Sequence, residues 1–207
     1  MSGADPGAAD SARRRGEVAL AGRVGDVAAV REALGDGDPL VRVAALAALV
    51  RLGRAHAADV APLLRDPDPR VRRDACELAG GVPRSEVEPL LDDADDRVVE
   101  AAAHAAGRLR LRGTTPRLSE LARSHRDPLC RESAVAALGA IGDGRGLAPI
   151  VEALGDVPAV RRRAVVALAS FRGPDVEAAL RRHLDDRDWQ VRQAAAEVLG
   201  LSGVEPR

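Results

Sequence analysis

The chain has 207 residues and a formal net charge of −1, and 46% of its residues are hydrophobic although only 1% are aromatic. The near-neutral charge excludes a global attraction to nucleic acid or acidic membranes, and no run approaches the roughly 18 apolar residues that span a bilayer. The hydrophobic residues are mostly Ala, Leu and Val, without the alternation of β-branched and aromatic residues typical of β-sandwiches, so the composition favours closely packed helices.

The rare residue types and the start of the chain indicate a compartment. Lys is absent and every basic residue is Arg, a bias typical of a GC-rich bacterial genome. Cys76 and Cys130 form no CxxC pair and no disulfide framework, which is typical of a reducing cytoplasm. The first residues are small and polar and lack the apolar segment of a secretory signal, so we expect a cytoplasmic protein.

The chain is expected to form one domain over residues 10–202, with residues 1–9 disordered and residues 203–207 as a C-terminal tail. The stretch "DSARRRGEVALAG", which begins at Asp10, ends with the spacing of the helices that follow. It has Glu17 where those helices have Ala, so we predict a degenerate helix that caps the N-terminal end of the domain.

A twelve-residue pattern then recurs along the chain. "DPLVRVAALAAL" at 38–49 returns as "DPRVRRDACELA" from position 68 and as "DPLCRESAVAAL" from position 127. Alignment on the Val-Arg pair gives six copies, whose anchor residues are Val41, Val71, Val98, Cys130, Val160 and Val191. An Ala follows four residues after every anchor, at Ala45, Ala75, Ala102, Ala134, Ala164 and Ala195. Such self-similarity is the signature of a repeat architecture.

Each copy carries the signals of a helix. An Asp stands three residues before most anchors, where its carboxylate can cap a helix start, and Pro often follows at the first helical position. The anchor, the Ala, and the residues three and seven beyond that Ala form one apolar stripe, which in the first copy is Val41, Ala45, Ala48 and Leu52. Glycines near the helix ends, at Gly80, Gly107, Gly139 and Gly200, are expected to terminate these helices.

A shorter amphipathic segment, such as "RSEVEPLL" in the third copy, precedes each of these helices. Each copy is therefore predicted to be a helical hairpin, in which a first helix A leads into a second helix B. The B helices begin near residues 38, 68, 95, 127, 157 and 188. One hairpin cannot bury its stripe alone, so the predicted fold is all-α, an α-α superhelix (solenoid) of about six hairpins behind the capping helix.

The runs of the form D-P-x-V-R-x-x-A-x-x-A-L-G, spread over roughly residues 26–201, resemble those of HEAT-repeat proteins, specifically the short-repeat, armadillo-type class named after phycobilisome lyases. The resemblance implies a ladder of Asp and Arg side chains between neighbouring repeats, with structural roles for Asp68, Arg42, Arg72, Arg131, Arg161 and Arg192. The pattern is interrupted by Val99 at an Arg position and by Val157 at an Asp position, so repeat three is expected to join its neighbours more loosely.

The outward side of the B helices is the predicted binding surface. It consists of positions −1, +2, +3 and +6 relative to each anchor, and the resemblance implies that it lines the concave surface of the solenoid. The candidate partner-binding residues are Arg70, Arg73, Glu77, Arg97, Glu100, His104, Glu132, Arg162 and Arg163. One interpretation is a merely solvated face. The favoured one is a mixed-charge surface on which a monomeric, non-catalytic scaffold binds a protein or peptide partner.

Other functions have weaker support in the sequence. Glu100 and His104 share a helix face, but one His without a second such pair does not predict a metal site or another cofactor. Arg161, Arg162 and Arg163 lack interleaved aromatic residues, which argues against nucleic-acid binding, and Trp189 is expected to cover the terminal apolar face. Both cysteines are expected to be buried, and no catalytic motif appears, so no enzyme is predicted. The alternative is a lyase or chaperone-lyase subunit of the bilin-lyase type, acting on a cofactor-bearing protein.

Overall fold

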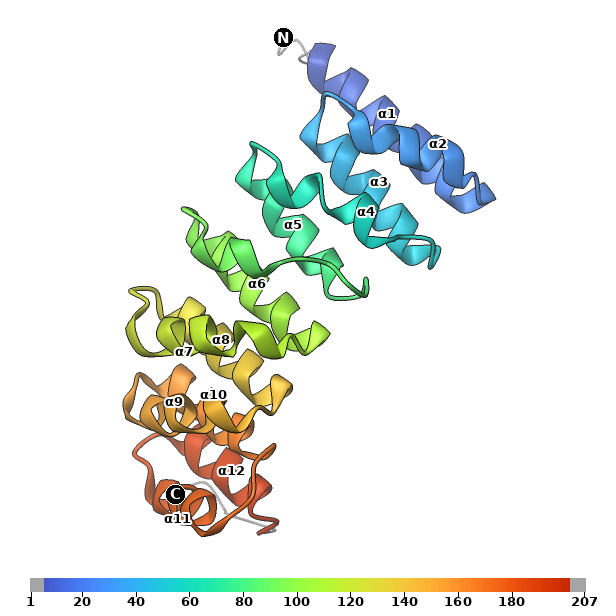
Figure 1. The fold of residues 1–207 in the computed structure, drawn as a ribbon. Coiled ribbons are helices and arrows are strands. Elements are labelled where there is room, and N and C mark those ends of the chain that lie inside the picture. Colours follow the sequence, from blue (N-terminus) through green and yellow to red (C-terminus); the bar gives the residue numbers. More distant parts are fainter. Residues whose placement is uncertain (1–5, 202–207) are drawn as a thin grey trace. The chain divides into compact units, whose positions relative to one another are not determined.

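The structure is a computed structural model that describes residues 6–201, and all regular secondary structure within this range is helical (Figure 1). The chain forms two compact units, Met1–Ala105 and Ala106–Arg207, where the sequence predicts one continuous domain. The described residues include no helix that is both long and apolar enough to cross a membrane. The predicted tail and residues 1–5 lie outside the described range.

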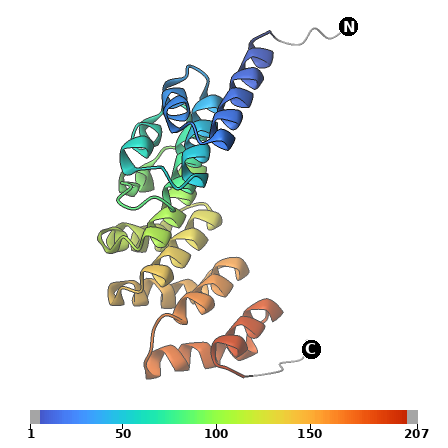
Figure 2. The same ribbon diagram turned by 90° about the vertical axis from the view of Figure 1, so that its right-hand side faces the viewer.

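The N-terminal unit begins with a long helix, followed by hairpins. Its elements are α1 (Pro6–Val24), α2 (Val27–Glu32), η1 (Ala33–Gly35), α3 (Pro39–Arg51), α4 (Ala57–Val60), η2 (Leu63–Arg65), α5 (Pro69–Ala79), η3 (Glu88–Asp92) and α6 (Asp96–Leu109), which runs through the boundary. Helices α1, α3 and α5 pack side by side, and the shorter segments lie against them (Figures 1 and 2). Here α1 packs on α3 as the predicted cap.

The C-terminal unit has the same plan. Its elements are η4 (Arg112–Thr114), α7 (Thr115–Ser124), α8 (Pro128–Ile141), η5 (Gly144–Gly146), α9 (Leu147–Glu152), η6 (Ala153–Gly155), α10 (Pro158–Leu168), α11 (Pro174–Arg182), η7 (His183–Asp185) and α12 (Trp189–Val198). Helix α10 packs between α8 and α12, while α7, α9 and α11 form the first helices of the hairpins.

We call α3, α5, α6, α8, α10 and α12 the B helices and the elements that precede each of them the A segments. Each B helix begins within one or two residues of its predicted start. The capping prediction is confirmed at five starts, because the side chains of Asp38, Asp68, Asp95, Asp127 and Asp188 each accept a hydrogen bond from a backbone N–H of the first turn. Helix α10 lacks such a cap, as expected from Val157.

The structure differs from the sequence predictions at two places. Residues 6–9 are helical rather than disordered, because α1 begins at Pro6, one turn before the predicted start. Two alanines favour the helix there, and Asp10 forms ion pairs with Arg13 and Arg14, one turn further on. In repeat three the predicted A helix is only the short 3-10 segment η3, which contains Pro89 at its second position and belongs to the shortest repeat of the chain.

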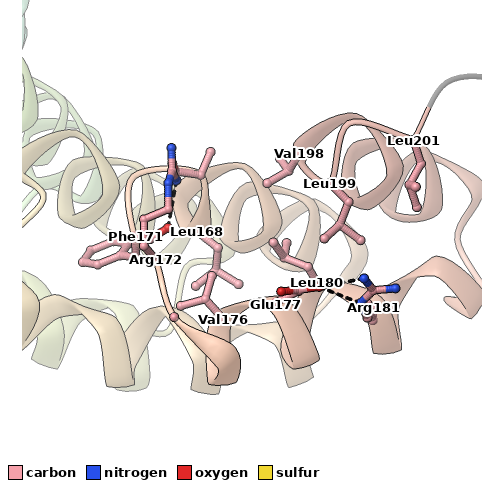
Figure 3. A pocket seen from close by; sticks show the side chains of 12 residues that line it. Leu168, Phe171, Arg172, Val176, Glu177, Leu180, Arg181, Val198, Leu199 and Leu201 are labelled. Atoms are coloured by element: carbon pink, nitrogen blue, oxygen red, sulfur yellow. Dashed lines mark hydrogen bonds and ion pairs between the residues drawn. The ribbon is translucent and has the colours of Figure 1, made fainter.

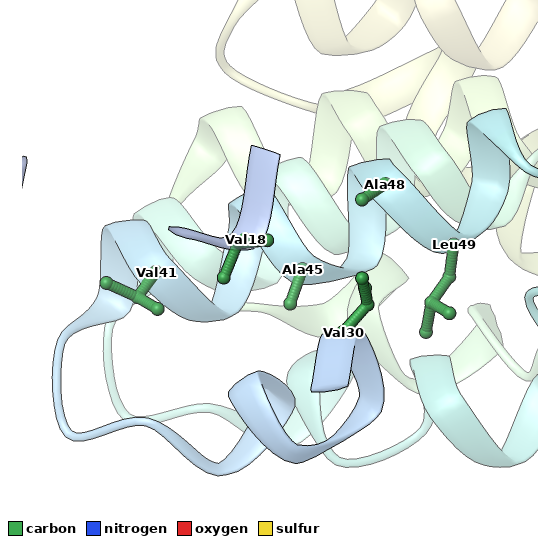
Figure 4. Packing of buried hydrophobic residues seen from close by; sticks show 6 residues of the cluster. All are labelled: Val18, Val30, Val41, Ala45, Ala48 and Leu49. Carbon is green, nitrogen blue, oxygen red and sulfur yellow. The ribbon is translucent and has the colours of Figure 1, made fainter. Parts of the chain in front are cut away.

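The apolar core confirms the repeat alignment and widens the predicted stripe. All six anchors and all six following alanines are 0–1% exposed. In α3, Leu46 and Leu49 are also fully buried, whereas the predicted Leu52 lies just beyond the helix and is half-buried. Figure 4 shows the reason: Val18 of α1 and Val30 of α2 approach α3 from different sides, so a B helix buries two sides rather than one.

Gly107 and Gly139 do not end their helices, contrary to the sequence prediction. Both lie inside B helices, where they allow the next B helix to approach closely. A Cβ added at Gly107 would lie 2.9 Å from Ala137 Cα, and one at Gly139 would lie 2.8 Å from Ala167 Cα. Real Cβ atoms do not approach other carbon atoms this closely, so these glycines set the distance between neighbouring repeats.

In the N-terminal unit, a ladder of buried ion pairs joins consecutive repeats. Arg42 Nε and Nη2 donate to the two carboxylate oxygens of Asp66 (2.8 and 2.9 Å), and Arg72 binds Asp93 in the same way (2.7 and 2.9 Å). Arg72 Nη1 also donates to the Asp66 carbonyl (2.8 Å), which links the two rungs. Hydrogen bonds from Arg72 hold the pKa of Asp93 below its usual value, against the opposing effect of burial.

A second ladder runs through the C-terminal unit. Arg131 makes two hydrogen bonds with Asp156 (2.6 and 2.7 Å), and Arg161 makes two with Asp186 (3.0 and 2.8 Å). Arg161 Nη1 donates to the Asp156 carbonyl, and Arg192 Nη1 donates to the Asp186 carbonyl, both at 2.8 Å. Bidentate pairs of this kind add geometric specificity to the stacking of repeats.

The implied ladder is therefore present, but its Asp residue was assigned wrongly. The ladder Asp stands two residues before the capping Asp in most loops, whereas Asp68 accepts from the backbone N–H of Arg70 and stays within its own repeat. At the third repeat both residues of the expected ion pair are replaced in the sequence. Val99 stands where the other repeats have the ladder Arg, and His125 stands where the next loop would have the ladder Asp. The looser joining of repeat three stays a prediction.

Candidate functional site

The nine predicted partner-binding residues all lie on the outward side of B helices, the surface that we call the B-helix face. Every one of them is exposed or half-buried. Helices α5 and α6 carry six of them in the N-terminal unit, namely Arg70, Arg73, Glu77, Arg97, Glu100 and His104. The other three, Glu132, Arg162 and Arg163, lie on α8 and α10 in the C-terminal unit.

Several charges in the N-terminal unit are neutralised by their own helix. Arg70 pairs with the capping carboxylate of Asp68 (2.7 Å), and this hydrogen bond lowers the pKa of Asp68 to about 2. Arg73 pairs with Asp74 (2.5 Å) and lies 3.7 Å from Glu77. The B-helix face therefore carries charges of both signs, several of which form ion pairs, and it does not present charges of a single sign.

In the C-terminal unit the predicted residues bridge neighbouring B helices. Arg163 on α10 donates to Glu132 on α8 (2.9 Å), so this charge has a carboxylate partner. Arg162 donates to the neutral side-chain oxygen of Gln190 on α12 (3.0 Å). The charge of Arg163 is therefore balanced by Glu132 on the neighbouring helix α8, whereas Arg162 keeps its positive charge beside α12.

Between α10 and α12, the B-helix face contains a groove of about 340 Å³. Its lining residues are Arg162, Arg163, Val166, Trp189, Gln190, Gln193, Ala194 and Glu197. Most of them occupy the outward positions that the repeat alignment defines. Trp189 is the exception: it was expected to cover the terminal apolar face, but it lies on this groove and is 54% exposed. The sequence did contain a signal for this exposed location, because Trp189 stands two residues before the last anchor and next to an outward position.

A second cleft, of about 490 Å³, lies in the last hairpin between α11 and α12 and shares no lining residue with the groove (Figure 3). Apolar side chains of Val176, Leu180 and Leu199 are directed into it. Arg181 at its edge is paired with Glu177 at 2.6 Å. A third cleft of similar size lies between α1, α2 and α3. Neither contains any of the predicted partner-binding residues.

Among the described residues, no three His, Cys, Asp or Glu side chains are grouped to hold a metal ion. Cys76 and Cys130 are buried, as predicted, and burial raises the pKa of the Cys76 thiol to about 12. A thiol of this pKa is almost entirely protonated at neutral pH and is a poor nucleophile. The groove presents guanidinium, carboxylate, amide and indole groups, which are suited to binding.

Comparisons with known proteins agree with this architecture. A family model described as "HEAT repeats" matches residues 60–139, 85–159 and 147–207, which together cover more than two thirds of the chain. No curated protein matches the sequence.

Among solved structures, the complex of CpcE and CpcF of phycocyanin lyase from Nostoc sp. PCC7120 is similar at 23% identity and a TM-score of 0.63, over 84% of this chain and 76% of that chain. A designed armadillo repeat protein in complex with peptide (KR)4 is similar at 17% identity and a TM-score of 0.60, over 84% and 98% of the two chains. An engineered protein matches at 19% identity and a TM-score of 0.62, over 85% and 96%.

Proposed function

The chain belongs to the HEAT-repeat family, and from this premise we propose that it is a non-catalytic scaffold that binds a protein or peptide partner on its B-helix face. Function in such a fold depends on the residues at a particular surface rather than on the architecture itself. The proposal therefore depends on what distinguishes the B-helix face from the rest of the repeats.

The observation that carries the proposal is a contrast within each B helix. The anchor and the following Ala are buried in all six copies and hardly vary. The outward positions vary from copy to copy and include exposed large apolar side chains at Leu40, Leu129 and Val166. Stacking of repeats constrains the first set and leaves the second free to encode recognition.

The chemistry of the face supports binding without a reaction. Its functional groups are Arg, Glu, Gln and the exposed imidazole of His104, and both thiols of the described residues are buried. The similar armadillo protein was solved with a bound peptide, and CpcE and CpcF form a complex with each other. Both likenesses are of the fold alone, and by analogy they support a partner-binding role for this chain.

The test is affinity capture from a lysate of the source organism, with quantitative mass spectrometry. We expect the wild-type chain to retain a polypeptide that the double variant Arg73→Glu/Arg162→Glu loses, because charge reversal in an interface creates like-charge contacts. The control is Arg65→Glu/Arg182→Glu, whose arginines are exposed on A segments and donate only to carbonyls of their own segments. Circular dichroism must show all three chains equally folded.

Equal capture by the B-helix-face variant, or loss of capture in the control alone, would contradict the proposal. A captured partner that carries a tetrapyrrole would instead favour the alternative of a bilin-lyase-type subunit.

A further inference from the structure

The groove between α10 and α12 identifies the kind of segment that the C-terminal unit binds. We propose that it takes an extended peptide segment in which a carboxylate lies next to an apolar side chain. This inference rests on the proposed function, since it names the partner chemistry for one part of the B-helix face.

The apolar half of the groove is formed by two exposed side chains. Trp189 is 54% exposed and Val166 is 47% exposed, while Ala194, which also lines the groove, is buried. A solvent-exposed indole that lines a groove offers a large, rigid contact area. Tryptophan and arginine are also the residue types most enriched among the contacts that dominate binding energy. An aliphatic side chain of a partner would cover Trp189 and Val166.

The positive charge of Arg162 beside the indole favours a partner with negative charge. Arg162 donates one hydrogen bond to the neutral Gln190 oxygen, which leaves its positive charge uncompensated by a carboxylate in the groove. Arg163 lines the same groove but is bonded to Glu132 on α8 at 2.9 and 3.2 Å, so its charge is balanced. The remaining N–H groups of Arg162 can therefore bind an incoming carboxylate, and a guanidinium binds carboxylates with matched geometry.

The amide side chains of the groove suit an extended backbone. Gln190 and Gln193 each carry both donors and acceptors, which can bind the N–H and C=O groups of a peptide that has no partner strand. Gln193 Nε2 donates to Glu197 at 3.0 Å, and Glu197 keeps its negative charge because Gln193 is neutral. Glu197 lies about two helical turns beyond Trp189 on α12, whereas Arg162 bonds Gln190, the residue next to Trp189. The positive charge of Arg162 is therefore the one beside the aromatic residue. A basic peptide would meet Arg162 with like charge and is disfavoured here.

A fluorescence titration tests this directly, because Trp189 is the one tryptophan of the chain and the chain has no tyrosine. The probes are three synthetic nonapeptides, built of Glu-Asp-Leu, Gln-Asn-Leu or Lys-Arg-Leu triplets. The acidic peptide should shift the Trp189 emission to the blue with saturation. The neutral and basic peptides should bind about tenfold more weakly or not at all, because steering and pairing by Arg162 are lost.

The variant Arg162→Gln should weaken binding of the acidic peptide by about tenfold, whereas Arg182→Gln, which alters an exposed arginine on α11, should leave it unchanged. An equal response to the basic peptide, no response to any peptide, or unchanged affinity in Arg162→Gln would overturn the inference.

A second measurement on the wild-type chain does not depend on the folding of a variant. Collisional quenching by iodide should be more efficient than quenching by caesium, because the uncompensated charge of Arg162 attracts anions to the indole. Equal quenching, or stronger quenching by caesium, would contradict the charge assignment. If the peptides fail while the Arg73→Glu/Arg162→Glu variant still loses capture of the partner, the groove inference is wrong and the proposed scaffold function stands. If that variant also captures the partner as well as the wild type does, both are wrong.

Discussion

Replacing Gly139 by alanine tests the close contact between α8 and α10. The new Cβ would lie 2.6 Å from Ala167 Cβ and 2.8 Å from Ala167 Cα, well inside the roughly 3.5–4.0 Å at which carbon atoms attract each other. The two helices must separate, and overpacking of this kind costs about 1–3 kcal/mol. Alanine recovers about 0.5–1 kcal/mol through its higher helix propensity, so we expect a net loss of about 1–2 kcal/mol.

The assay is urea unfolding followed by circular dichroism, in which such a loss lowers the midpoint by about 0.5–1 M. Gly16→Ala is the matched control, because Gly16 lies inside α1 with no atom within 4 Å of an added Cβ. That variant should gain about 0.5–1 kcal/mol. If Gly139→Ala raised the midpoint as Gly16→Ala does, the close approach of α8 and α10 would be refuted.

Three further results are expected from the ladder and from the buried thiols. Arg161→Met should cost about 3–5 kcal/mol in urea unfolding, since it leaves the Asp186 carboxylate, 8% exposed, without its partner; a loss under about 1 kcal/mol would contradict the ladder. Asp93 has a lowered folded-state pKa, so its stabilising contribution is complete above the unfolded value near pH 4 and is lost as the pH falls through the folded value. Thermal unfolding should therefore occur at lower temperature at pH 3 than at pH 7, and an unchanged midpoint would show that the pairing is not stabilising. Cys76 and Cys130 should react with a thiol reagent only after unfolding, and rapid labelling of either in the native chain would place it outside the core.

The features that recur in the sequence were the ones that could be predicted from it. The spacing of anchors such as Val41 and Val160 and of the alanines that follow them located all six B helices, because buried positions repeat with the period of the fold. The capping role of residues such as Asp38 followed from local chemistry alone, since an N-cap depends on the first turn of its own helix.

Features that depend on contacts between repeats were predicted less well. The ladder carboxylate is Asp66 rather than Asp68, because an ion pair between repeats depends on the path of the loop and not on local propensity. Gly139 was interpreted as a helix end because its actual neighbour, Ala167, is distant in the sequence. Trp189 was placed on the apolar end because a hydrophobic residue near the last helix is more often buried than exposed.

The most direct test of partner binding on the B-helix face is site-specific photo-crosslinking of the captured complex. A photoreactive side chain is placed at Glu77 or Gln193, which are exposed on α5 and α12, or at the control positions Glu88 and Glu120, which are exposed on A segments. The account predicts adducts with the partner from the two B-helix positions and none from the controls. Adducts from Glu88 and Glu120 without any from Glu77 and Gln193 would contradict it.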